Sequence, residues 1–95
     1  MADGLLKNNI TRVTSGYIIS NVGFDLVQYV YEFTDAKKPV IKKLIIKPKK
    51  DLNVTINEKD EVLITSEYGI ELTDLNILKF VTQDFGIKFY FIAYF

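Results

Sequence analysis

The chain has 95 residues, the size of one domain, and 48% of them are hydrophobic, which argues against disorder. It contains no Cys and no His, which excludes disulfides, thiolate metal sites, cysteine nucleophiles and the commonest general base. The 12 basic and 12 acidic residues cancel, and no apolar run is long enough to span a bilayer as a helix, so we expect no membrane partner.

The first nine residues, "MADGLLKNN", lack the basic stretch and long apolar core of a signal peptide, so we expect none. Leu5 and Leu6 are the large apolar residues of this segment besides Met1. They are too few for a core element, yet enough to anchor an arm on a neighbour. We therefore predict an N-terminal assembly arm over residues 1–9 and one domain over residues 10–95.

The next segments show the alternation of strands. Residues 10–13 and 17–20 are short strand candidates. In "DLVQYVYEF", residues 25–33, a period of two places Val27, Tyr29, Tyr31 and Phe33 on one face. This pattern predicts a strand.

Charge is unevenly distributed along the middle of the chain. Residues 36–50, "AKKPVIKKLIIKPKK", hold seven Lys and no acid, whereas residues 51–74 hold seven acids and one Lys. A basic stripe can bind nucleic acid, but most of these Lys alternate with apolar residues, as on the solvent face of a strand, and the acids can pair with them across adjacent strands. We predict that Lys42, Lys43 and Lys47 lie within salt-bridge reach of these acids, within the subunit or across a subunit interface, and we expect no nucleic-acid partner.

The clearest strand is "LNVTIN", residues 52–57, with Leu52, Val54 and Ile56 pointing inward. The charged turn "NEKDE" and the segment "EVLITS" complete a predicted β-hairpin. In "TDLNILKFVT", residues 73–82, a strand is favoured over a helical turn capped by Thr73. Turn residues recur at a spacing of roughly eight to twelve residues, which is typical of a β-sandwich or small barrel. We predict an all-β fold, a single small antiparallel β-sandwich that is Ig-like or jelly-roll-like.

The chain ends in "GIKFYFIAYF", residues 86–95, which is apolar on both strand faces. One face, from Ile87 to Ala93, is wholly apolar and belongs in the core. The other carries Tyr90, Ile92 and Tyr94, side chains typical of protein interfaces. Two interpretations stay open: a central strand covered by a loop or arm of the same chain, or an oligomer interface formed by these three residues.

The sequence contains no catalytic constellation, so we expect a protein that is not an enzyme and that has no metal site and no cofactor. There is no Gly-rich phosphate loop, and "DLNVTINEKDE" lacks the central Gly and alternating acids of a calcium loop. Four tyrosines would suit a sugar-stacking platform, but equally a core or an interface: Tyr17, Tyr29, Tyr31 and Tyr68.

One family resemblance covers residues 40–95. The order "VIKKLIIKP", "LNVTIN", "EVLIT", "EYGIEL", "DLNILKFVT" and a closing aromatic strand resembles small β-sandwich virion proteins of tailed bacteriophages, of the head-decoration, head-fibre or tail-accessory type. The chain departs from them at Glu67, Tyr68 and Gly69, where a more Gly-rich turn is common. The resemblance implies virion localisation, a homotrimer, contacts with other virion proteins such as a major capsid or tail protein, and no catalysis.

Three hypotheses for function therefore stand. The leading one is a non-enzymatic structural component that decorates or stabilises a phage capsid or tail through homo-oligomeric contacts. The second is a carbohydrate- or receptor-binding β-sandwich module that uses surface Tyr. The third is a small inhibitor or adaptor that binds a host protein by strand addition.

Overall fold

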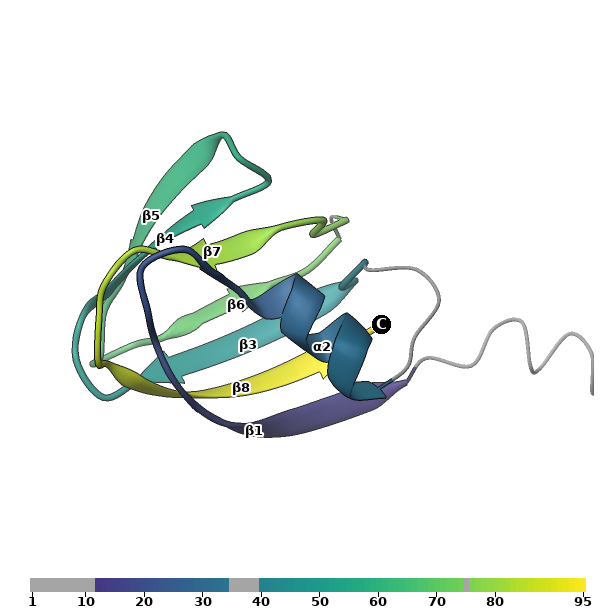
Figure 1. Cartoon of the computed structure of the whole chain (residues 1–95), viewed down its shortest axis with the longest axis horizontal. Coiled ribbons are helices and arrows are strands. Elements are labelled where there is room, and N and C mark those ends of the chain that lie inside the picture. The colour runs from purple at the N-terminus through teal and green to yellow at the C-terminus, as the bar shows by residue number, and fades with distance from the viewer. Residues whose placement is uncertain (1–11, 35–39, 75) are drawn as a thin grey trace, which may run out of the picture.

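The computed structural model describes residues 12–34, 40–74 and 76–95 of the chain. Two four-stranded antiparallel sheets pack together (Figure 1), which confirms the predicted all-β sandwich. Sheet A has the strand order β1-β8-β3-β6, and sheet B has the order β2-β7-β4-β5. The strands are β1 (Val13–Ile19), β2 (Phe24–Asp25), β3 (Lys43–Pro48), β4 (Leu52–Ile56), β5 (Asp60–Ile64), β6 (Ile70–Leu72), β7 (Phe80–Thr82) and β8 (Lys88–Tyr94).

The strand order identifies a jelly roll among the sandwiches. Antiparallel pairs form between β1 and β8, β2 and β7, β3 and β6, and β4 and β5. These pairs alternate between the two sheets, as they do when one long antiparallel ribbon is rolled up. An immunoglobulin-like sandwich would instead keep its first two strands side by side in one sheet. Of the two predicted alternatives, the topology matches the jelly roll.

The strand predicted over residues 25–33 is wrong, because this segment forms the helix α2 (Leu26–Thr34). Its start is capped by Asp25, whose Oδ1 accepts a hydrogen bond from the backbone N–H of Val27 at 3.0 Å. The same carboxylate oxygen accepts a hydrogen bond from the N–H of Phe80 in β7 at 3.2 Å. Asp25 therefore both begins the helix and ties it to sheet B.

The face that α2 buries follows helical spacing. Leu26, Val27 and Val30 are buried, whereas Gln28 donates to the exposed carboxylate of Glu32 one turn later at 2.9 Å. The ring of Tyr29 meets that of Phe91 in β8 edge-on, with 6.2 Å between centroids. The helix thus closes the sandwich beside the two-residue strand β2 (Figure 1).

The core between the sheets agrees with the predicted inward faces. Leu52, Val54 and Ile56 of β4 are buried, and their alternation holds along the strand. On β8 the buried residues are Phe89, Phe91 and Ala93, and Ile87 packs against the core from the preceding turn. The period of two therefore placed both strands correctly with respect to the core.

Four smaller expectations had different outcomes. The β4–β5 hairpin is confirmed, and its turn is closed by the Lys59 N–H bonding the Ile56 carbonyl at 3.1 Å. Among the described residues of the segment 73–82, β7 is a strand and Ile77 forms an isolated bridge with Ile41. Of the candidates at 10–13 and 17–20, Val13 and residues 17–19 lie in one strand, β1, whereas residues 10 and 11 lie outside the described residues. Leu5 and Leu6 of the predicted arm lie outside the described residues.

Candidate binding face on sheet A

The predicted interface residues lie at the middle of one sheet surface, here called the outer face of sheet A. It consists of the side chains of sheet A that point away from sheet B. Because β8 lies between β1 and β3, its outward residues are flanked on both sides. Three rows of paired residues cross the face, each listed in the strand order β1, β8, β3: Val13, Tyr94 and Lys43; Ser15, Ile92 and Ile45; Tyr17, Tyr90 and Lys47.

The outer face is open at β1 and half-buried at its centre. The exposed fractions of Val13, Tyr17 and Ile19 are 56%, 59% and 67%. The three predicted interface residues, Tyr90, Ile92 and Tyr94, are of intermediate burial. Figure 1 places α2 and sheet B on the other side of sheet A, so no element among the described residues packs over this face. Its role as a subunit interface stays a prediction.

Cations rest against the aromatic rings on and beside this face. The Nζ atom of Lys43 lies 5.3 Å from the ring centroid of Tyr94, and that of Lys88 lies 4.7 Å from the ring centroid of Tyr17. Such cation–π contacts are each worth about 0.5–1 kcal/mol at exposed sites. The outer face therefore combines apolar area with positive charge at its rim.

The three lysines that were predicted to pair with acids make other contacts among the described residues. In the described ranges, the ion pair within salt-bridge distance joins Lys79 to Glu58, on the other sheet. Lys47 instead donates to the backbone carbonyl of Glu67 at 3.3 Å, and exposed Lys42 precedes β3. Register places Glu71 of β6 opposite Ile45, on the diagonal between Lys43 and Lys47. Pairing of the three lysines across a subunit interface stays a prediction.

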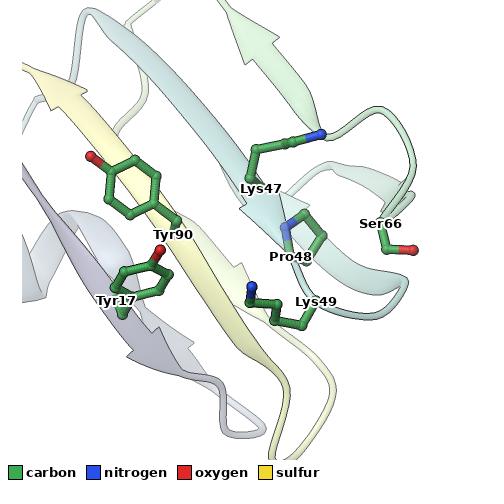
Figure 2. Close-up of a pocket in the computed structure, with 6 residues that line it drawn as sticks. All are labelled: Tyr17, Lys47, Pro48, Lys49, Ser66 and Tyr90. Atoms are coloured by element: carbon green, nitrogen blue, oxygen red, sulfur yellow. The ribbon is translucent and has the colours of Figure 1, made fainter.

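A pocket of 410 Å³ opens at one end of the outer face (Figure 2). Two tyrosines and two lysines line it together with a proline and a serine, from β1, β8, the end of β3 and the turn before β6: Tyr17, Lys47, Pro48, Lys49, Ser66 and Tyr90. The rings of Tyr17 and Tyr90 have centroids 5.0 Å apart and are tilted by 54°. They form one angled aromatic surface across neighbouring strands.

The four tyrosines considered as a sugar platform do not lie together. Tyr29 packs between the rings of Phe24 and Phe91, Tyr31 is on α2, and Tyr68 is in the turn before β6. Only Tyr17 of that set reaches the pocket, where its neighbour is Tyr90. Alternation in each strand predicts that both point outward, but their adjacency depends on the pairing of the first and last strands.

Comparison of the chain with protein-family models, with curated proteins and with solved structures finds no match. Within the described residues, no three acidic side chains are grouped closely enough to hold a metal ion. No helix in that part of the chain is both long and apolar enough to cross a membrane.

Proposed function

We propose that this protein is a non-enzymatic structural subunit that associates with copies of itself through the outer face of sheet A. The observation that carries the proposal is the row of Tyr90, Ile92 and Tyr94 along the outward side of a central strand. We further propose a phage virion as the setting, where the subunit decorates or stabilises the capsid or tail. That setting rests on the resemblance over residues 40–95. The jelly roll agrees with it, because viral capsid proteins use this fold, although lectins do too.

The apolar side chains of the outer face are enough for weak association of two copies but need a further contact for stable association. Full burial of a large apolar side chain is worth about 1.5–3 kcal/mol, and Val13, Ile45, Ile92 and Tyr94 begin partly buried. A gain of about 1 kcal/mol each gives roughly 8 kcal/mol when two copies meet, against association costs of about 4–15 kcal/mol. Stable association therefore needs a closed ring or a further contact, such as the predicted arm with Leu5 and Leu6. The choice of a trimer comes from the resemblance, since dimers are the commonest symmetric state.

Sedimentation velocity over a range of concentrations tests the interface. The variant Ile92→Glu, Tyr94→Glu should stay folded by circular dichroism but sediment as a monomer, while the wild type sediments as an oligomer. Leu63→Glu is the matched control, because Leu63 is 54% exposed on the opposite sheet. A wild-type monomer at the highest concentration would refute self-association, and an unfolded double variant would show that the face is part of the core. Purification of assembled particles with the protein in fixed stoichiometry tests the virion setting separately.

The pocket favours a second function, the carbohydrate-binding module. Two tyrosine rings beside two lysines are a recognised combination of an apolar stacking surface with polar groups that fix orientation. Tyr90 belongs to both the proposed interface row and the pocket, so burial of Tyr90 between copies and ligand binding at the pocket exclude each other on the same subunit.

A further inference from the structure

The pocket at the end of the outer face points to a ligand of defined chemistry. We propose that Tyr17, Tyr90, Lys47 and Lys49 bind an acidic saccharide, in which a sugar ring lies against the tyrosines and its carboxylate meets the lysines. The site is formed by residues of one subunit. It therefore does not depend on the proposed self-association.

The aromatic surface has the shape that a sugar ring needs. Tyr17 is 59% exposed, and its ring is tilted by 54° against that of Tyr90, so the pair forms a corner instead of a flat stack. Tyr offers a broad apolar face for sugar C–H groups and a phenol oxygen for their hydroxyls. The volume of 410 Å³ lies within the range of about 300–1,000 Å³ that small-molecule pockets have.

The charge around the pocket selects an anion. Lys47 and Lys49 line it, the Nζ atom of Lys88 lies 4.7 Å from the Tyr17 ring centroid, and none of the described residues that line it is acidic. Figure 2 shows the Lys49 ammonium directed toward the two tyrosines and the Lys47 ammonium directed away from them. Lys47 holds the carbonyl of Glu67 at 3.3 Å and retains further donors, because an ammonium group has three. A carboxylate on the sugar would complete this arrangement.

A single-stranded nucleic acid offers the same combination of rings and negative charge, but the face fits it less well. Successive bases need successive aromatic side chains. On β8 the next outward residue after Tyr90 is Ile92, so Tyr94 follows only after roughly 13 Å at about 3.4 Å per residue. The chain also has zero net charge, whereas nucleic-acid-binding domains are usually basic.

The test is a titration of the isotope-labelled full chain followed by amide chemical shifts, with calorimetry for affinity. The probe is a hexasaccharide of alternating glucuronate and N-acetylglucosamine, compared with a neutral N-acetylglucosamine hexamer. We expect the acidic probe to shift the amides around Tyr17, Tyr90 and Lys49, and to bind more weakly as salt rises. The variant Lys47→Ala, Lys49→Ala should weaken binding about tenfold. Lys59→Ala, in the β4–β5 turn outside the pocket, removes one lysine charge as a control and should bind like the wild type.

Further variants separate stacking from charge. Tyr17→Ala should weaken binding as much as the double lysine variant, whereas Tyr17→Phe should retain most of it because the ring remains. Equal binding of the neutral hexamer, or no loss in the double lysine variant, would overturn the charge assignment. No shift at these amides with the acidic probe at about 10 mM would overturn the site. Tighter binding of a single-stranded oligothymidylate with the same dependence on Tyr17 would assign the site to nucleic acid. Ile92→Glu, Tyr94→Glu should still bind the saccharide, so failure of self-association and failure of this site are distinguishable.

Discussion

Replacing Gly69 by Ala tests how the turn beside the pocket is built. Gly69 stands at the start of β6 with φ +67, and its amide bonds the carbonyl of Thr65 at 2.8 Å. A Cβ at this position would overlap the carbonyl oxygen of Ile46 on the neighbouring strand and press on the side-chain methylenes of Lys47. The single glycine of the segment Glu67, Tyr68, Gly69 is therefore placed where a side chain is excluded twice, by conformation and by space.

Gly86 separates these two causes, because it has φ +79 but no atom within 4 Å of an added Cβ. An L-residue in the left-handed region costs about 1–2 kcal/mol, offset by about 0.4–1 kcal/mol from the stiffer unfolded chain. Gly86→Ala should thus destabilise by about 0.5–1 kcal/mol. Gly69→Ala adds the overlap with β3, and overpacking of this kind costs about 1–3 kcal/mol. We expect a total of about 2–4 kcal/mol.

Thermal unfolding followed by circular dichroism measures the difference. For a domain of this size about 1 kcal/mol corresponds to roughly 4–8 °C in Tm, so Gly69→Ala should melt about 4 °C or more below Gly86→Ala. Equal melting temperatures for the two variants would refute the overlap. Because the added methyl also displaces Lys47, the Gly69 variant should bind the acidic saccharide more weakly at a temperature where it is still folded.

The other two predictions concern the helix cap and the ion pair. Asp25→Ala should destabilise by about 2–3 kcal/mol in urea unfolding, because the N–H groups of Val27 and Phe80 lose a shared acceptor; Asp25→Asn keeps an acceptor and should lose less, and equal losses would count against the cap. The hydrogen bond from Lys79, and then its charge, lowers the pKa of Glu58, while the same pair raises the pKa of Lys79. The ion pair's contribution to the free energy of unfolding is therefore fully present above the unfolded-state pKa of Glu58, and it is lost as pH falls through the lowered folded-state pKa. At alkaline pH the same contribution is lost as pH rises through the raised folded-state pKa of Lys79. Both side chains are exposed, so the effect is small and screened by salt; a Glu58→Gln variant with an unchanged pH profile of stability at low salt would contradict it.

Most strands could be predicted because their apolar and polar residues alternate clearly in the sequence. The helix could not be predicted because its apolar spacing fits both a strand and a helix. In residues 25–33 apolar side chains occur at spacings of two, three and four, so a strand and a helix both find an apolar face. The deciding feature is Asp25, which caps the helix locally and also bonds Phe80 in β7. The second contact depends on the folded sheet, and periodicity contains no information about it.

The candidate site also has one feature that the sequence predicts and one that it does not. The outward direction of Tyr90, Ile92 and Tyr94 follows from the period of two in β8. The proximity of Tyr17 to Tyr90 does not, because residues far apart in the chain meet only once the first and last strands pair. The jelly-roll order supplies that pairing, and a sequence pattern alone leaves several orders open.

The position of β8 explains only half of its apolar character. A central strand of a sandwich must bury its inner face, which accounts for Phe89, Phe91 and Ala93. Sheet B contains two central strands, β7 and β4, and the outward residues of β4 are polar, Asn53 and Thr55. A central strand of this fold therefore tolerates polar outward side chains, so the core does not require Tyr90, Ile92 and Tyr94. The outward residues of β8 are aromatic and apolar whereas those of β4 are polar, and this difference between the sheets supports placing the proposed interface and the proposed saccharide site on sheet A.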